Sequence, residues 1–277
     1  MQQLLDPTGI ARLREALVTA GYTSTGIAGH LGAEATDAAR RGDLRRTLQR
    51  TGDGGRLATL IRLFVCGQTE PVAAVDAAFA PLPLADAVSA GLIEPAPLDG
   101  AVGLRAAIEL EAYGDRWILS DLSASMRPGL PLPADHVLGV GAASTTLAGA
   151  TIRRPVGSAL DLGTGCGIQA LHLSEHAERV TATDLSTRAL RFAATTAALA
   201  GLDWELLAGD LVEPVKGRRF DLVVSNPPFV AGSGTRTHTY RDSGRVGDGV
   251  CAELVAAAPA LLTAGGTMQF LANWLHV

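Results

Sequence analysis

A glycine-rich turn between an apolar strand and a helix is the feature that most constrains the fold of this chain. The turn is Gly163-Thr-Gly-Cys-Gly167, and it joins the apolar run 159–162 to a helical pattern that begins at Ile168. Glycine has no Cβ and tolerates positive φ, so such a turn lets the backbone approach a bound ligand closely. Open α/β sheets bind ligands where their strands end. The turn therefore predicts a ligand site at a sheet edge.

The spacing of the glycines indicates which ligand the turn accepts. A dinucleotide-binding turn has the pattern Gly-x-Gly-x-x-Gly, whereas Gly163, Gly165 and Gly167 are each two residues apart. A pyrophosphate site, and with it a nicotinamide-dependent oxidoreductase, is therefore the less favoured interpretation.

Short apolar runs alternate with helical patterns from residue 156 onward. The strand candidates are 159–162, 180–184, 205–208, 222–225 and 267–272. Strands that alternate with helices form a parallel sheet covered on both faces. The expected fold class is therefore α/β, with a doubly wound, mainly parallel, Rossmann-like sheet. The small residues of 135–151 predict a further helix before the first strand.

The chain before this region has a helical pattern. Asp6 and Pro7 are typical of a helix start, and Gly21 is typical of a helix end. Apolar residues on one face predict a second helix over 57–65, and further helices begin near Pro71 and Leu84, so the region is helix-rich until Ile93.

A hairpin is predicted after these helices, and a linker follows it. Residues 106–112 alternate in polarity, Gly114 and Asp115 supply a turn, and 116–119 resume an extended pattern. Helices followed by a hairpin resemble a winged-helix domain in element order alone. The three prolines of 126–134 predict a connecting segment. We therefore expect two domains: a helix-rich N-terminal domain at 1–125, for which a winged helix is one candidate, and a second domain at 126–277.

Composition limits the class of protein. A hydrophobic content of 47% over 277 residues is enough for a substantial core. The sequence has no apolar run of about 18 residues and no secretion signal at its start, so we expect a cytoplasmic protein. The three cysteines are far apart and match no zinc spacing, so neither a disulfide framework nor a metal is expected.

Charge gives a divided indication about nucleic acid. The net charge of −5 argues against broad electrostatic binding of a polyanion. A local basic segment nevertheless contains Arg40, Arg41, Arg45, Arg46, Arg50, Arg56 and Arg62. This segment is either a basic binding face or an ordinary solvated helix surface.

The region from about residue 135 to 277 resembles the class I S-adenosylmethionine-dependent methyltransferases. In that family an acidic residue precedes a Gly-x-Gly-x-Gly turn, as Asp161 does here. The resemblance implies that S-adenosyl-L-methionine is the cofactor and that Asp161 orients its methionine end, directly or through water. The cofactor-binding residues that it implies are Asp161, Gly163, Thr164, Gly165, Gly167, Asp184, Leu185, Gly209, Asp210, Leu211 and Asn226.

Two further acidic residues end the next two strands in order. Asp184 ends the run 180–184, where a carboxylate can accept both hydroxyl hydrogens of the cofactor ribose. Asp210 follows the third strand, where the resemblance implies that it accepts a hydrogen bond from the adenine amino group while Leu211 lines the ring. An acidic residue at a strand end is also a common helix N-cap, but three such features in order favour the cofactor interpretation.

The tetrapeptide Asn226-Pro227-Pro228-Phe229 follows the fourth strand and predicts the chemistry. It resembles the motif of methyltransferases that act on amide or exocyclic amino nitrogens, and all four residues are its catalytic candidates. The Asn226 Oδ1 atom and the Pro227 carbonyl can each accept one N–H from the substrate, which aims the nitrogen lone pair at the methyl group. The prolines stiffen the backbone, and the Phe229 ring can stack on a planar group.

The substrate stays open between two classes. The motif is similar both to HemK-type enzymes, which methylate a glutamine amide in translation release factors, and to small-domain enzymes that methylate guanine or adenine in RNA. The acidic net charge tilts the prediction slightly toward protein glutamine, whereas the basic segment and the possible winged helix favour RNA or DNA. A third class, a non-catalytic nucleic-acid-binding cofactor sensor, has no use for the intact motif.

Two features near the C-terminus complete the expectations. The polar loop that contains Arg236, His238, Tyr240, Arg241 and Arg245 is either a substrate lid or a mobile surface loop. After the fifth strand the chain stops at Val277, so the two strands that usually complete a sheet of this family are absent. We expect either a fragment of a longer protein or a sheet edge that is open or covered by a partner.

Overall fold

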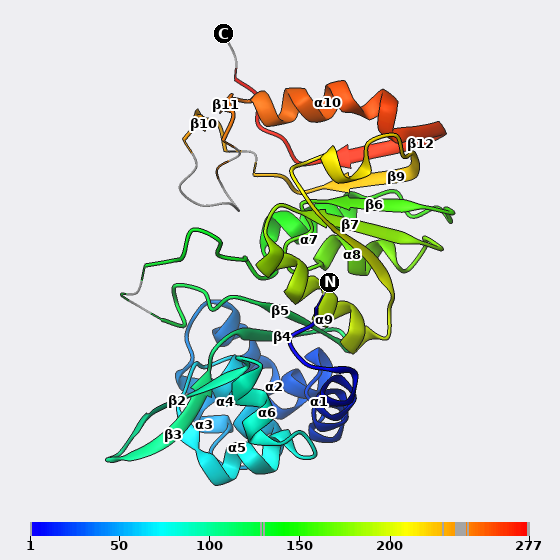
Figure 1. The fold of residues 1–277 in the computed structure, drawn as a ribbon. Coiled ribbons are helices and arrows are strands. Elements are labelled where there is room, and N and C mark those ends of the chain that lie inside the picture. Colours follow the sequence, from blue (N-terminus) through cyan, green and yellow to red (C-terminus); the bar gives the residue numbers. More distant parts are fainter. Residues whose placement is uncertain are drawn as a thin grey trace. The chain divides into compact units, whose positions relative to one another are not determined.

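The computed structural model describes residues 2–127, 129, 131–228, 230–235, 242 and 244–275 (Figure 1). These residues form two compact units. The C-terminal unit contains 131–197 and 201–277 together with 1–3, and the N-terminal unit contains 4–130 together with 198–200. Within the described part of the chain, no helix is long and apolar enough to cross a membrane.

A five-stranded parallel sheet is the centre of the C-terminal unit, in the order β12-β9-β6-β7-β8. Its strands are β6 (Ala159–Leu162), β7 (Val180–Asp184), β8 (Trp204–Ala208), β9 (Phe220–Ser225) and β12 (Leu262–Phe270). The predicted doubly wound parallel fold is therefore confirmed. The fifth strand begins at Leu262, five residues before the predicted start at Thr267, with a register shift between these two residues against β9.

Helices connect and flank these strands (Figure 1). They are α7 (Ala142–Ala150), α8 (Ile168–Leu173), α9 (Thr187–Ala200) and α10 (Gly249–Leu261), with a 3-10 turn at Glu213–Val215 and a short ladder of β10 (Gly232–Ser233) and β11 (Val246–Gly247). Leu254 and Leu261 of α10 share a buried cluster with Leu160 and Leu162 of β6. Burial of these leucines fixes α10 on the sheet.

The helix predicted over 135–151 is wrong in its first half. Residues 135–141 are not helical, and α7 begins only at Ala142. Gly139 and Gly141 lie in the non-helical part, and glycine is unfavourable in a helix interior. This extended segment has a different function in the structure, because it lines the pocket described below.

The N-terminal unit is rich in helices, as predicted. Its helices are α1 (Pro7–Ala20), α2 (Ser24–Arg40), α3 (Arg45–Arg50), α4 (Arg56–Phe64), α5 (Val72–Phe79) and α6 (Leu84–Ser89). The predicted boundaries of α1 are confirmed, since Asp6 Oδ1 accepts a hydrogen bond from Gly9 N over 2.7 Å and Gly21 has φ +70°. Gly32 interrupts α2 with a non-helical φ of +77°.

Two antiparallel sheets complete this unit. One has the order β1-β3-β2, formed by β1 (Glu70–Pro71), β2 (Ile93–Leu98) and β3 (Ala101–Ala106). The other is the hairpin of β4 (Glu109–Tyr113) and β5 (Arg116–Ser120), which confirms the predicted hairpin with a later start. Helices followed by a hairpin also occur here as α4, β1, α5, α6 and the β2–β3 hairpin, and the predicted winged helix stays a prediction.

The β2–β3 hairpin was not predicted from the sequence, because Pro95 and Pro97 obscure its first strand. Proline is tolerated there since β2 pairs only with β3 and is an edge strand. Asp99 and Gly100 form the turn with φ values of +45° and +82°. An Asp-Gly pair with positive φ at both positions is a strong hairpin signal, and it is the signal that could have located these strands.

The β4–β5 hairpin is fastened to the end of α1 by two buried hydrogen bonds. The Tyr22 hydroxyl donates to the Leu110 carbonyl over 2.9 Å, and Trp117 Nε1 donates to the Tyr22 carbonyl over 2.7 Å. Tyr22 is 1% exposed. The hydroxyl therefore satisfies a carbonyl that water does not reach.

We expect Tyr22→Phe to loosen the hairpin, because the buried Leu110 carbonyl would lose its donor. An unsatisfied buried acceptor costs about 1 kcal/mol or more, which corresponds to about fivefold faster local opening. Hydrogen–deuterium exchange of peptides that cover 109–120 measures this change. Ser125→Ala is the control, because its hydroxyl is exposed and contacts the Ser123 hydroxyl. Unchanged exchange in Tyr22→Phe would contradict the assigned role.

Candidate functional site

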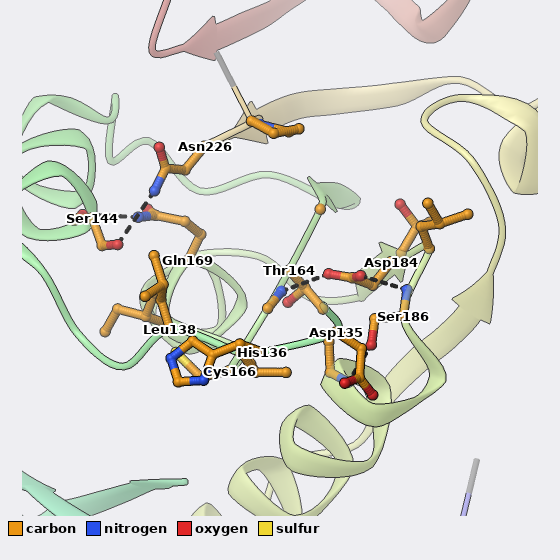
Figure 2. A pocket seen from close by; sticks show the side chains of 18 of the residues that line it. Asp135, His136, Leu138, Ser144, Thr164, Cys166, Gln169, Asp184, Ser186 and Asn226 are labelled. Carbon is orange, nitrogen blue, oxygen red and sulfur yellow. Dashed lines mark hydrogen bonds between the residues drawn. The ribbon is translucent and has the colours of Figure 1, made fainter. Parts of the chain in front are cut away.

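A pocket lies where the strands of the C-terminal unit end, and Figure 2 shows the residues around it. The segment before α7, the turn after β6, the residues that follow β7 and β8, and the start of the loop after β9 all contribute to its wall. Nine of the predicted cofactor residues line this pocket: Gly163, Thr164, Gly165, Asp184, Leu185, Gly209, Asp210, Leu211 and Asn226. Asp161 and Gly167 do not line it.

The glycine-rich turn leaves open space beside its backbone. Gly163 and Gly165 have φ values of +72° and +56°, a conformation that L side chains rarely adopt. A Cβ atom built on either residue would meet no atom within 4 Å. The space that a side chain would fill is therefore available to a ligand, and these residues fit a cofactor that packs closely against the backbone.

Asp184 faces this turn from the end of β7 (Figure 2). Its Oδ2 accepts a hydrogen bond from Gly165 N and its Oδ1 accepts one from Ser186 N, both over 2.8 Å. Burial raises the pKa of this carboxyl, and the backbone donors act in the opposite direction. A carboxylate has about four acceptor positions, so Asp184 keeps capacity for hydroxyl groups of a ligand.

Asp161 lies beneath the turn and is fully buried. Its Oδ2 accepts hydrogen bonds from Thr164 Oγ1 over 2.6 Å and from Ala170 N over 3.0 Å, while Oδ1 has no hydrogen-bond partner among the described residues. These bonds fasten the turn and the first turn of α8. Burial raises the pKa of Asp161 to about 7, helped by the charge of Asp184 and opposed by the two hydrogen bonds. Its predicted action on the methionine end of the cofactor stays a prediction.

Gly167 is required by packing. Its φ is +90°, and a Cβ atom there would lie 2.7 Å from Trp204 Cζ3. Trp204 Nε1 in turn donates to Ser174 Oγ over 2.8 Å, so the ring cannot move away freely. Gly167 thus lets the chain enter α8 against the indole ring.

The end of β8 is a constrained corner of the pocket. A Cβ on Gly209 would lie 2.5 Å from Pro214 Cγ, and Leu211 has a φ of +44°, which is unusual for a residue with a side chain. Asp210 forms an ion pair with Arg245 over 3.1 Å, and Arg245 also pairs with Glu253 over 2.9 Å. These carboxylates raise the pKa of the Arg245 guanidinium.

The predicted catalytic motif begins at the pocket wall. The Ser225 hydroxyl donates to the Leu162 carbonyl over 2.8 Å and holds the end of β9 to the end of β6. Asn226 and Pro228 line the pocket, whereas Pro227 is buried outside its lining. Asn226 Nδ2 donates to Ser144 Oγ over 3.3 Å, and its buried Oδ1 has no hydrogen-bond partner among the described residues. Phe229 and the residues 236–241 of the predicted lid lie outside the described residues.

Several pocket residues were not predicted from the sequence. They come from the non-helical segment 135–141, from α7, from the glycine-rich turn and from the start of α8: Asp135, His136, Val137, Leu138, Ser144, Cys166, Ile168 and Gln169. Gly139 and Gly141 are the signal that could have marked this segment as a loop near the site. Among the residues with described positions, no group of three or more His, Cys, Asp or Glu side chains is arranged to hold a metal ion.

The raised pKa of Asp161 makes stability depend on pH. The pKa is 3.8 in the reference state and about 7 in the folded chain, so between these values the folded state keeps a proton that the unfolded state has released. Stability from this group is therefore lost as pH rises from about 4 to about 7, by an amount on the order of 4 kcal/mol. Asp161→Asn removes this loss. We expect the Tm of Asp161→Asn minus that of wild type to increase from pH 5 to pH 8 in scanning calorimetry. A Tm difference that does not change with pH would contradict the raised pKa of Asp161.

Comparison with known families divides the chain in two. Residues 139–275 match the family described as methyltransferase small domain, and residues 19–107 match a domain of unknown function, DUF7059. A ribosomal RNA small subunit methyltransferase C of Alcanivorax borkumensis is 30% identical over 164 residues, which are 59% of this chain and 46% of that protein. A release factor glutamine methyltransferase of Deinococcus radiodurans is 41% identical over 120 residues, 39% of this chain and 43% of that protein. The chain thus spans less than half of the length of these relatives.

Solved structures give the same kind of neighbour. A 16S rRNA N2 methyltransferase of T. thermophilus, in complex with S-adenosylmethionine and guanosine, is 21% identical and covers 70% of this chain and 43% of its own, with a TM-score of 0.40. A methyltransferase of Pyrococcus furiosus is 22% identical and covers 53% and 71%, with a TM-score of 0.39. The segment 139–275 is therefore similar to the methyltransferase small domain family, and it contains the parallel sheet described above.

Proposed function

We propose that this chain transfers a methyl group from S-adenosylmethionine to the exocyclic amino group of a guanine or adenine base in RNA. The observation that carries the proposal is the amide of Asn226 at the pocket wall, whose buried Oδ1 atom has no partner among the described residues. A buried acceptor without a donor is costly. A substrate N–H group would satisfy it.

The chemistry needs an acceptor at this position. The lone pair of an exocyclic amino nitrogen is delocalised into the base, so the nitrogen must be oriented before it can attack a methyl group. Asn226 Oδ1 and the Pro227 carbonyl would each accept one N–H, which turns the lone pair out of the ring plane and stabilises the positive charge that develops on nitrogen. The N–CH₃ bond would form as the S–CH₃ bond of the donor breaks, with S-adenosylhomocysteine as the leaving group, and water would take the extra proton from the nitrogen.

The chain's own residues would hold the cofactor, which supplies the electrophilic methyl group. The open space beside Gly163 and Gly165 accommodates a ligand against the backbone, and Asp184 is positioned to accept the ribose hydroxyls. Asp210 would accept a hydrogen bond from the adenine amino group of the cofactor. That bond would compete with the ion pair between Asp210 and Arg245.

The choice of RNA rests mainly on the relatives. The ribosomal RNA methyltransferases align with 59% of this chain, more than the length of the small-domain match alone. The N-terminal unit supports RNA binding less strongly. Helix α6, which precedes the β2–β3 hairpin, contains Asp86 and no Lys or Arg. In the basic segment, Arg40, Arg45, Arg46 and Arg62 form ion pairs with acidic residues, which leaves Arg41, Arg50 and Arg56 available for phosphate contacts.

A glutamine amide of a protein is the second candidate. The 41% identity to a release factor glutamine methyltransferase favours it, and the predicted acceptor pair suits an amide nitrogen equally well. The net charge of −5, which tilted the sequence-based prediction toward this substrate, is compatible with both.

The two halves of the pocket can be tested separately. We expect Asp184→Ala to weaken S-adenosylmethionine binding by more than tenfold in calorimetry, since loss of a hydrogen bond to a charged group costs about 1.5–3 kcal/mol. We expect Asn226→Ala to keep cofactor affinity and to lower turnover by about 100-fold or more. Full methyl transfer by Asn226→Ala would overturn its assigned role.

The substrate class can be tested by labelling. The chain is incubated with methyl-labelled S-adenosylmethionine and either unmodified small subunit rRNA transcribed in vitro or a purified release factor. We expect the label to be in the RNA, so that digestion with ribonuclease releases it and digestion with protease does not. Label confined to the release factor would replace the RNA proposal with the glutamine one. Cofactor binding without label in either polymer would favour a non-catalytic sensor.

A further inference from the structure

Among the described residues, the side-chain amide of Asn226 is held by one hydrogen bond, which its Nδ2 atom donates. Its Nδ2 donates to Ser144 Oγ over 3.3 Å (Figure 2), and its buried Oδ1 has no hydrogen-bond partner among the described residues. An asparagine amide rotates about its last side-chain bond through a broad range. Without the bond to Ser144, the amide plane would have no fixed position, and Oδ1 would face the substrate only part of the time.

Ser144 is itself held in place. It is 8% exposed, and its carbonyl accepts a hydrogen bond from Gln169 Nε2 over 2.8 Å. Gln169 is 3% exposed and belongs to α8, directly after the glycine-rich turn. Ser144, Gln169 and Asn226 all line the same pocket. One buried and one partly buried hydrogen bond thus connect the helix after β6 to the residue after β9 by way of α7.

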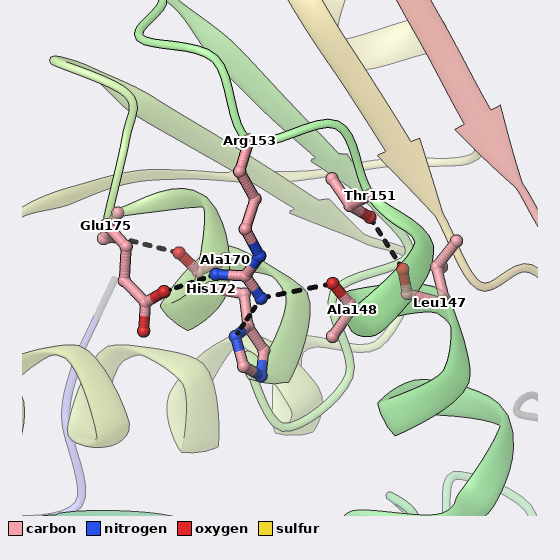
Figure 3. Close-up of polar contacts among 8 residues, drawn as sticks. Leu147, Ala148, Thr151, Arg153, Ala170, His172 and Glu175 are labelled. Carbon is pink, nitrogen blue, oxygen red and sulfur yellow. Dashed lines mark hydrogen bonds and ion pairs between the residues drawn. The ribbon is translucent and has the colours of Figure 1, made fainter.

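The far end of α7 is fastened to the end of α8 as well (Figure 3). Arg153 Nη2 donates to the Ala148 carbonyl over 3.2 Å, and Arg153 Nη1 donates to Glu175 Oε2 over 2.5 Å. Arg153 Nη2 also lies 3.3 Å from His172 Nδ1. Gln169 contacts the first turn of α7 and Arg153 contacts its last turn, so α7 has little freedom to move away from α8. The Ser144 hydroxyl therefore keeps its position beside the pocket.

We propose that Ser144 is a positioning residue for methyl transfer: it holds the Asn226 amide so that Oδ1 faces the incoming amino group, while Gln169 anchors Ser144 from behind. The proposal rests on the proposed function, in which Asn226 accepts an N–H from the substrate. Ser144 acts through Asn226, and the same positioning serves a nucleobase amine and a glutamine amide.

The kinetic test compares two neighbouring hydroxyl groups on α7. We expect Ser144→Ala to lower kcat about tenfold, the equivalent of one hydrogen bond, with S-adenosylmethionine affinity within twofold of wild type, and Ser144→Thr to restore most of the activity. Thr145→Ala is the matched control, because Thr145 is exposed and its hydroxyl bonds the Gly141 and Ala142 carbonyls. An unchanged kcat in Ser144→Ala, or an equal loss of cofactor affinity, would overturn the proposal.

A second measurement does not depend on any substrate. The sequence contains two asparagines, Asn226 and Asn273. Asparagine-selective ¹⁵N labelling therefore gives two side-chain NH₂ pairs, which Asn273→Gln assigns. We expect the heteronuclear NOE of the Asn226 pair to fall in Ser144→Ala and to stay unchanged in Thr145→Ala. An equally rigid Asn226 amide in Ser144→Ala would contradict the positioning role, even if the wild-type chain methylated neither RNA nor release factor.

Discussion

The pairing of β6 with both of its neighbours is the constraint on which the site depends. Leu162, the last residue of β6, is level with Thr183 of β7 and with Ser225 of β9. The residues that follow these three positions therefore lie together at one edge of the sheet: the glycine-rich turn, Asp184 at the end of β7, and Asn226. Because a slip of one residue reverses the faces of a strand, burial of Leu160 and Leu162 against α10 holds this register. The site is thus a consequence of core packing.

The sequence predicts the C-terminal unit well because its signals are local. Each strand from β6 to β9 is a short apolar run, and each functional residue follows a strand end. The segment 135–141 was predicted wrongly because its small and apolar residues suit a helix, although Gly139 and Gly141 are unfavourable in one. Ser144 and Gln169 were also missed, because two hydrogen bonds between residues 25 and 82 positions apart in the sequence leave no local pattern.

In the N-terminal unit, the helices were predicted from their caps and apolar faces, while the β2–β3 hairpin was missed. Pro95 and Pro97 are unfavourable in a paired strand, and only the edge position of β2 makes them compatible. Helix α6, which precedes this hairpin, contains no Lys or Arg. A cluster of cationic side chains lies elsewhere in this unit, in the segment from Arg40 to Arg62.

Because Arg245 pairs with Asp210, binding of the proposed cofactor would depend on salt concentration, as binding of RNA does. The pair is partly exposed, so dissolved ions weaken it. An adenine amino group that competes with Arg245 for the Asp210 carboxylate would consequently gain as ionic strength rises. Binding of a polyanion such as RNA weakens under the same change, because each released counterion gains less entropy when it enters a more concentrated salt solution. Raising the salt concentration would thus strengthen binding of the methyl donor and weaken binding of the RNA acceptor. Both would be bound only between a lower and an upper salt concentration.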